Sequence, residues 1–403
     1  MTHSPYMTES NPTRSDVIWQ VLDVRAIWIK EFASALGKVV PTLGWLPSIS
    51  SKGRLERWER EEVLQDPALR VRHFPLQRGF ARPLVGWLAR EGSRLSQRMS
   101  RHSPDTERSP LVCCSPHYAA VAEAWGGPVI YYVTDLFPAY GEDPQRIKAF
   151  DLRMCRAARL VCPNSQRIAQ YLQSEADCPE EKILIIPNAT RASNLLTEPA
   201  LKPAPLPQDI TDLPRPVAGV LGNLASNIDW LLLQDVITRT PWLSWAFVGP
   251  TEMPVTDPEQ SRARASLMAR RGRIRFAGYK PYGQLRDYAR AFDIAVLPYR
   301  KVEPTFSGSS TRFYEHLAAC RPILATRGFE ELLHKEPLLK LADSAEEMTA
   351  ALESLNATDF LDTFEAARWK ASRNETWESR ASAMKDAVVQ KYPYPAEALT
   401  EVA

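Results

Sequence analysis

The stretch FSGSSTRFYEHLAACRPILAT, residues 306–326, predicts a loop of small residues, a short helix, a turn and a buried strand. The N-terminus of such a helix favours an anion, because its backbone N–H groups are unpaired and its dipole is positive there. Arg312 adds a guanidinium whose fork geometry suits a phosphate. Glu315 lies on the same helical face, whereas Phe313 and Leu317 point to the core. This face therefore predicts a site for the diphosphate and ribose of a nucleotide sugar.

The alternatives at these positions are structural. Glu315 suits the helix dipole as a carboxylate near the N-terminus, whatever it binds. Ser309 and Ser310 fit an ordinary N-cap, which uses the same N–H groups as a phosphate would. Arg312 could equally be a surface arginine of the helix.

Length and composition bound the class of protein. A chain of 403 residues is too long for one ordinary core and predicts two domains. Its 44% hydrophobic and 24% charged residues are typical of a globular protein, and a net charge of +2 does not decide for or against nucleic acid. Six cysteines without CxxC or zinc spacing predict buried thiols in a reducing compartment. With no signal region and no run of about 18 apolar residues, we expect a cytoplasmic protein, at most peripheral on the inner membrane face.

Short apolar strands alternate with helical patterns along both halves of the chain. Strands are expected at 17–24, 39–43, 70–74, 111–114, 129–134, 160–162 and 183–186, then at 217–221, 244–248, 274–277, 294–298 and 322–325. Helices are expected at 27–36, 83–100, 144–158, 166–174, 227–239, 282–291, 309–320, 344–355, 359–372 and 377–390. The pattern predicts an α/β protein of two doubly wound Rossmann-like domains, with ligands bound at the carboxyl ends of the strands, across a cleft.

Prolines mark the boundary between the two halves. Six prolines fall within residues 199–216, which predicts a semi-rigid linker. We therefore expect an acceptor-binding domain at 1–198 and a nucleotide-sugar-binding domain at 217–375. A last helix within 376–403 is expected to cross back to the first domain.

Several segments of the second half resemble, in order, the nucleotide-binding domain of GT-B glycosyltransferases. They are GVLGNL with Asp229 following (219–224), WAFVGP (245–250), IRFAGY (274–279) and DIAVLPY (293–299), and they lead into 306–326. IPNA at 186–189 resembles the IPNG that precedes the linker in this family. The resemblance covers roughly residues 128–330. It implies the donor-binding residues Gly222, Asn223, Gly278, Tyr279, Ser309, Ser310, Thr311, Arg312 and Glu315.

Two departures from the family pattern indicate which group of GT-B enzymes the chain resembles more. Residues 223–229 lack the Arg and Lys that commonly hold the diphosphate. In the Glu-x7-Glu pattern the first position is Ser307, and Glu315 occupies the second. The chain is thus less similar to the typical retaining enzymes of glycosyltransferase family four than to glucuronosyltransferases of bacterial exopolysaccharide assembly. Arg312 would be the main counter-charge of the diphosphate, helped by Lys280 or Lys301.

A carboxylate follows the strand expected at 129–134, where a general base belongs in a two-domain sheet protein. Asp135 would deprotonate an acceptor hydroxyl as it attacks the anomeric carbon, which gives inversion by single displacement. The alternative for Asp135 is a turn aspartate before the next helix. His117, after the strand at 111–114, ranks second as the base, and Asp23 ranks third.

The acceptor is expected at the end of the first strand. Many GT-B enzymes carry a glycine-rich loop there, but residues 24–28 contain no glycine. Acceptor contacts would therefore come from side chains, and we expect them from Asp23, Arg25 and Trp28.

A basic segment runs from Arg70 to His102, with eight arginines, one acid (Glu91) and interleaved aromatic and aliphatic residues. Such a pattern on an amphipathic helix favours an anionic membrane surface or a lipid-phosphate acceptor. Nucleic acid is the rival partner, but no nucleic-acid motif accompanies the segment, and we expect none to bind. A plain solvated helix face is the structural alternative.

Together these features predict an inverting glycosyltransferase, hexosyl or uronosyl, of cell-envelope exopolysaccharide biosynthesis. It would transfer a sugar from a nucleoside-diphosphate donor, UDP-sugar favoured, to a lipid-linked carbohydrate hydroxyl. No cofactor or metal is expected, since no Asp-x-Asp motif occurs and a helix terminus with an arginine can neutralise the diphosphate. The alternatives are a retaining GT-B enzyme, a non-catalytic sugar-nucleotide or polysaccharide-binding protein of the same fold, and an epimerase that acts on the donor.

Overall fold

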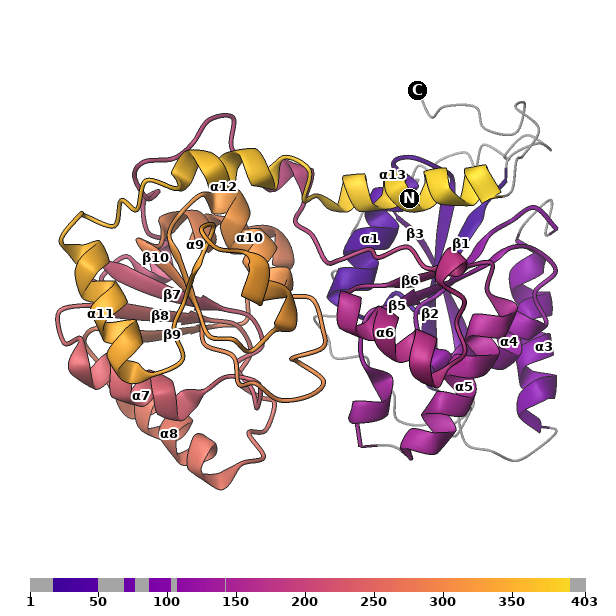
Figure 1. The fold of residues 1–403 in the computed structure, drawn as a ribbon, viewed down its shortest axis with the longest axis horizontal. Coiled ribbons are helices and arrows are strands. Elements are labelled where there is room, and N and C mark those ends of the chain that lie inside the picture. Colours follow the sequence, from indigo (N-terminus) through magenta and orange to yellow (C-terminus); the bar gives the residue numbers. More distant parts are fainter. Residues whose placement is uncertain (1–16, 50–68, 77–86, 103–106, 142, 392–403) are drawn as a thin grey trace, which may run out of the picture.

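The computed structural model describes residues 17–49, 69–76, 87–102, 107–141 and 143–391. Two α/β domains stand side by side, and the last helix, α13 (Trp377–Lys391), lies over the first domain (Figure 1). The first part of the helix expected at 83–100, residues 83–86, lies outside the described residues, as do Arg78 and Arg82 of the basic segment.

The first domain is built on a parallel sheet of six strands in the order β3-β2-β1-β4-β5-β6. The strands are β1 (Trp19–Leu22), β2 (Thr42–Ile49), β3 (Arg70–Leu76), β4 (Leu111–Cys113), β5 (Val129–Val133) and β6 (Leu160–Pro163). Its helices are α1 (Ile27–Gly37), α3 (Trp87–Ser100), α4 (Ala119–Glu123), α5 (Pro144–Ala157) and α6 (Gln166–Glu175).

The second domain repeats this plan with the sheet order β12-β11-β10-β7-β8-β9, again all parallel. Its strands are β7 (Val217–Leu221), β8 (Ser244–Val248), β9 (Ile274–Gly278), β10 (Ile294–Leu297), β11 (Ile323–Ala325) and β12 (Lys340–Leu341). Its helices are α7 (Trp230–Arg239), α8 (Pro258–Ala269), α9 (Leu285–Ala291), α10 (Thr311–Ala319), α11 (Ala345–Asn356) and α12 (Glu365–Ser372).

Both faces of each sheet are covered, which explains why the strands read as continuous apolar runs. In β5, Tyr131 belongs to the core beneath α3 to α6, whereas Tyr132 belongs to the core beneath α1 and α13. In β7, Val220 and Val217 divide in the same way between the two cores of the second domain. The structure thus confirms the predicted fold of two doubly wound α/β domains.

Helix α13 is part of the core of the first domain although it follows the second in sequence. Trp377, Met384 and Val388 are fully buried in the same cluster as Phe32 of α1. The segment that leads into α13 pairs with Thr190, which donates its N–H to the Glu375 carbonyl at 3.1 Å and accepts from the Trp377 N–H at 2.8 Å.

The proline-rich segment 199–216 lies against the second domain. Arg215 contacts Asp293 at 2.8 Å, and Arg321 donates to the Leu201 carbonyl at 3.0 Å. Asp209 accepts from the Tyr288 hydroxyl at 2.7 Å. These bonds hold the segment on the domain that follows it.

Two local predictions were wrong. The segment at 183–186 is not a regular strand: Ile183 forms an isolated bridge with Val161 of β6, and the Leu184 and Ile186 N–H groups donate to the Val161 and Pro163 carbonyls. The helix expected from 359 begins at Glu365, because Asp359, Phe360 and Thr363 have left-handed φ angles that a helix cannot include.

Candidate functional site

The strand order of each sheet reverses beside its first strand, and ligands of such sheets bind where the chain leaves the carboxyl ends at that point. In the second domain this point follows β7 and β10. Gly222, directly after β7, has φ +122, and a Cβ placed on it would lie 3.0 Å from Nε of Arg312. A glycine is therefore what allows the Arg312 side chain to lie against this turn.

Arg312 is half-buried on the first turn of α10. Its Cζ lies 5.8 Å from the centre of the Tyr282 ring. Its Nη1 is shielded from solvent and has no hydrogen-bond partner in the part of the chain that the structure describes. A buried guanidinium nitrogen without an acceptor is costly, and an anionic ligand at this turn would supply one.

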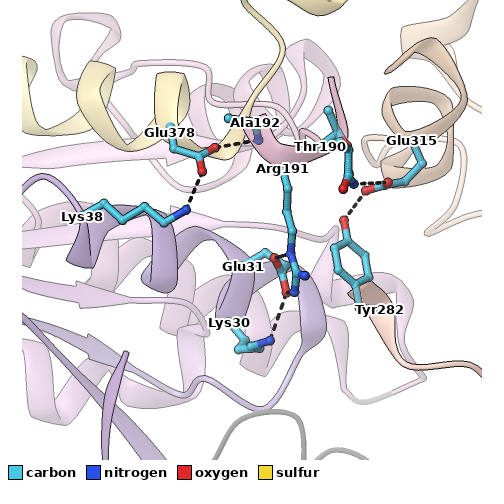
Figure 2. A network of polar contacts seen from close by, with 10 residues as sticks. Lys30, Glu31, Lys38, Thr190, Arg191, Ala192, Tyr282, Glu315 and Glu378 are labelled. Atoms are coloured by element: carbon cyan, nitrogen blue, oxygen red, sulfur yellow. Dashed lines mark hydrogen bonds and ion pairs between the residues drawn. The ribbon is translucent and has the colours of Figure 1, made fainter. Parts of the chain in front are cut away.

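Glu315, one turn along α10, is 2% exposed. Its Oε1 accepts from the Tyr282 hydroxyl (Figure 2). Its Oε2 accepts from Nδ2 of Asn194 at 3.0 Å. Burial raises the pKa of Glu315, and the Tyr282 hydrogen bond and the Arg312 charge offset part of that rise. The Thr190 side chain also interacts with this carboxylate. A carboxylate oxygen has two lone pairs, so one that accepts a single bond could still accept from a ribose hydroxyl.

The N-terminus of α10 is already occupied by a carboxylate of the same chain. Ser310 is the N-cap and accepts from the Phe313 N–H, as expected. Glu331 accepts from the Ser310 N–H and from the Ser309 hydroxyl, both at 2.9 Å, and from the Tyr314 hydroxyl. The anion that the sequence predicted at Ser309 and Ser310 therefore has an internal counterpart that sequence reasoning missed.

The same loop also contacts the first domain. Ser309 Oγ accepts from the Asn188 N–H at 3.0 Å, and the Ser309 carbonyl accepts from the Asn188 side chain at 2.7 Å. Ser307, at the position of the missing glutamate, accepts from Ser165 through its carbonyl at 2.5 Å and from Arg167 through its hydroxyl at 3.0 Å. Residues 307–309 thus belong to the seam between the domains.

The remaining residues predicted for the donor site are exposed or half-buried. Asn223 is exposed, Thr311 is half-buried, and Gly278 has φ +69 with open space at its Cβ position. Tyr279 is half-buried after β9. Of the two lysines named as helpers, Lys280 contacts Asp209 at 2.8 Å and Lys301 lies over the Phe306 ring at 4.9 Å.

In the first domain, Asp135 follows β5 and is partly buried. Its carboxylate accepts from the Tyr140 hydroxyl at 2.8 Å and from the Thr134 hydroxyl at 3.2 Å. Burial raises the pKa of Asp135 to about 6, and these two hydrogen bonds offset part of that rise. A carboxylate that titrates near 6 suits a general base at neutral pH.

Asp23 and His117 lie at the same edge of the sheet, because β1, β4 and β5 are neighbours. Asp23 has φ +82, forms an ion pair with Arg25 and accepts from the Tyr118 hydroxyl at 2.8 Å. His117 Nδ1 lies 2.9 Å from the Ser115 hydroxyl. Trp28 is half-buried, and its indole N–H has no partner among the described residues.

A polar network that the sequence did not predict joins α1 to this site (Figure 2). Arg191 binds Glu31 of α1 through two hydrogen bonds of 2.5 and 2.6 Å, and its Cζ lies 5.0 Å from the Tyr282 ring centre. Asn194 connects Thr190, at 3.1 Å, to Glu315. No local pattern could have revealed these partners, since they are far apart in sequence.

The described part of the basic segment has exposed arginines and buried apolar residues. Arg70 and Arg72 of β3 are exposed, as are Arg94, Arg98 and Arg101 at α3, whereas Leu95 and Met99 are buried. Within the described ranges, no helix combines the length and apolar character needed to cross a bilayer. Nor do three His, Cys, Asp or Glu side chains gather there as a metal site would require.

Two family models match the chain, one to each domain. The model of Glycosyltransferase Family 4 matches residues 48–193, and that of Glycosyl transferases group 1 matches residues 215–357. No curated protein matches at a significant level.

Solved structures share the fold over nearly the whole chain. Alr3699/HepE of Anabaena in complex with UDP-glucose has 14% identity and a TM-score of 0.67, over 93% of this chain and 99% of that one. A glycosyltransferase from Rickettsia africae has 12% identity and a TM-score of 0.66, over 94% and 100%. A UDP-forming α,α-trehalose-phosphate synthase from Burkholderia vietnamiensis has 12% identity and a TM-score of 0.63, over 93% of this chain and 98% of that one. At these identities the likeness is one of fold.

Proposed function

We propose that this chain, which belongs to the GT-B glycosyltransferases, transfers a sugar from a UDP-sugar to a hydroxyl of a lipid-linked carbohydrate, with inversion. Membership of the family confirms the resemblance drawn from residues 128–330. The observation that carries the proposal is Arg312, whose Nη1 is shielded beside Gly222 with no acceptor among the described residues. The solved relative Alr3699/HepE, which binds UDP and UDP-glucose, supports the choice of nucleotide.

On the donor side, Arg312 neutralises the diphosphate and Glu315 accepts the ribose hydroxyls. Because Glu331 already binds Ser309 and Ser310, the helix end contributes mainly through the backbone N–H groups of Thr311 and Arg312, which have no intrahelical acceptor. Gly222, Asn223, Gly278 and Tyr279 line the approach of the nucleotide. Arg312 supplies the positive charge that the leaving group needs, so we propose that no metal or other cofactor is required.

On the acceptor side, Asp135 takes the proton of the acceptor hydroxyl. The acceptor oxygen bonds to the anomeric carbon while the bond from that carbon to the diphosphate oxygen breaks, and the electron pair leaves with UDP. Arg25 and Trp28 offer a guanidinium and an indole N–H to the acceptor. His117 is the second candidate for the base; Asp23 is the third, because its ion pair with Arg25 favours a structural role.

The exposed arginines of β3 and α3 support a place at an anionic membrane surface, on its cytoplasmic face, where a lipid-linked acceptor of exopolysaccharide assembly would lie. Co-sedimentation with vesicles tests this partner. We expect more protein to sediment with anionic than with neutral vesicles, and equal recovery would contradict the proposal.

The function itself is tested by nucleotide binding and release. We expect UDP to raise the melting temperature and a UDP-hexose or UDP-uronic acid to release UDP only when acceptor is present. Arg312→Met should abolish the shift with UDP, whereas Arg239→Met, at an exposed arginine of α7, should keep it. Absence of a shift with any nucleoside diphosphate would overturn the proposal. Release without acceptor would indicate an enzyme that acts on the donor, and the anomer of the product separates inversion from retention.

A further inference from the structure

Arg312 and Glu315 stand three residues apart on α10, a spacing at which opposite charges on a helix normally pair. They do not form an ion pair in this structure. The two oxygens of Glu315 accept instead from Tyr282 and Asn194, and Arg312 Nη1 has no partner among the described residues. Two groups that attract one another across a buried site are thus kept from neutralising one another.

We propose that Tyr282 and Asn194 are positioning residues that hold Glu315 away from Arg312, so that the guanidinium stays available for the diphosphate of the donor. This inference rests on the proposed function and assigns a role within the same site. If Glu315 paired with Arg312, the diphosphate would have to displace a carboxylate before it could bind.

The two positioning side chains are themselves held in place. Tyr282 is 3% exposed, and the guanidinium of Arg191 lies over its ring. Arg191 does not compete for Glu315, because its Nε and Nη2 bind the two oxygens of Glu31. Asn194 is 4% exposed, and its Nδ2 also donates to the Thr190 hydroxyl.

Most of these supports come from outside the second domain. Glu31 lies on α1 of the first domain, and Arg191 and Asn194 lie in the segment that leaves that domain. The charge state of the donor site in the second domain therefore depends on the segment that joins the two domains. Figure 2 shows the bonds among Lys30, Glu31 and Arg191 and the bond from Tyr282 to Glu315, and the guanidinium of Arg191 lies 5.0 Å from the centre of the Tyr282 ring.

The test compares UDP with uridine, which shares the base and ribose but lacks the diphosphate. Calorimetry gives the dissociation constants of both ligands for each protein variant. The ratio of the Kd of uridine to the Kd of UDP measures how much affinity the diphosphate adds. We expect Tyr282→Phe to lower this ratio about tenfold, because Glu315 is released to pair with Arg312. Adding Glu315→Gln to Tyr282→Phe should restore the ratio, since the amide carries no charge to neutralise Arg312.

The matched control is Tyr288→Phe, which removes a tyrosine hydroxyl bonded to Asp209 in the same domain and should leave the ratio unchanged. If Tyr282→Phe does not fold, Asn194→Ser tests the same point. A ratio in Tyr282→Phe equal to that of the unmodified protein would overturn the inference, as would a double variant that fails to restore it. If the unmodified protein binds neither ligand, the proposed function fails, and the inference fails with it.

Discussion

The two domains have the same strand order but opposite charge arrangements at the point where that order reverses. In the first domain, Asp23 is neutralised by Arg25 and accepts a further bond from Tyr118. In the second, Arg312 lies against Gly222 with a shielded nitrogen that has no acceptor in the described part of the chain. The Asp23 carboxylate thus has partners within its own domain, whereas Nη1 of Arg312 has no acceptor among the described residues.

This difference matches the chemistry proposed for each side. A diphosphate brings its own negative charge, so its site gains from a cation that the fold leaves unpaired. A sugar hydroxyl brings no charge and needs a base instead. Asp135 fits that need, because burial raises its pKa to about 6 while Tyr140 and Thr134 orient it. Substitutions at both points test this difference between the domains.

The largest effect is expected from Asp135→Asn. It should lower kcat by about 10²–10⁴-fold, as expected for loss of a general base, and leave the affinity for UDP unchanged. Because a base acts in its deprotonated form, the rate of the unmodified enzyme should fall as pH drops below about 6. Steady-state kinetics across pH 5–8 measure both. His117→Gln is the comparison variant, and a greater loss of kcat there would move the base to His117.

Arg312→Met should weaken UDP binding about 10–100-fold, because a charge-assisted hydrogen bond is lost, and should change uridine binding little. Calorimetry with both ligands measures the difference. Arg327→Met removes an exposed arginine paired with Asp343 and serves as the control. Equal weakening of UDP and uridine would mean that Arg312 supports the site as a whole.

Gly222→Ala should weaken UDP binding about tenfold, since its Cβ would displace the Arg312 side chain. It should also cost about 1–3 kcal/mol of stability, because an alanine at φ +122 is strained. Gly272→Ala is the matched control, with φ +80 and no neighbour within 4 Å. Chemical denaturation measures the loss of stability, and calorimetry measures the loss of UDP affinity. If both variants weaken UDP equally, the displacement of Arg312 is not the cause.

The smallest effect is expected from Asp23→Asn. Its partner Arg25 is partly exposed, so loss of the ion pair should cost no more than about 1 kcal/mol of unfolding free energy. UDP affinity should stay unchanged, and KM for the acceptor should rise. A collapse of kcat comparable to that of Asp135→Asn would instead identify Asp23 as the base.

Much of the fold was predictable because parallel strands buried on both faces are visible as apolar runs. The strands around Val129–Val133 and Val217–Leu221 were found in this way. The segment expected as a strand at 183–186 does lie beside β6, to which Leu184 and Ile186 donate their N–H groups, but only Ile183 forms a bridge. An apolar run does not show how much of a segment will pair with its neighbour. Helix α8 was missed because few of its residues, among them Ala263 and Leu267, are buried and apolar.

At the site, the sequence singled out Arg312 and Glu315 as candidates, but it did not point to the residues that bond to Glu315 or to the helix terminus. Asn194 reaches Glu315 across 121 positions, and Arg191 reaches Glu31 across 160. Glu331 occupies the helix terminus from 21 positions beyond Ser310. A local sequence pattern indicates which groups could bind an anion. It does not indicate which of them already bind a residue that is distant in sequence, as Ser309 and Ser310 bind Glu331.

The chain crosses between the domains twice, once after Thr190 and once before Trp377, and the two crossings are bonded to one another side by side. The domains are therefore bonded at this paired crossing as well as at residues 307–309, where Ser307 and Ser309 contact the first domain. Arg191 and Asn194 come within four residues after Thr190 at one of these crossings, so the bond from Asn194 to Glu315 ties the donor site to the place where the chain passes between the domains.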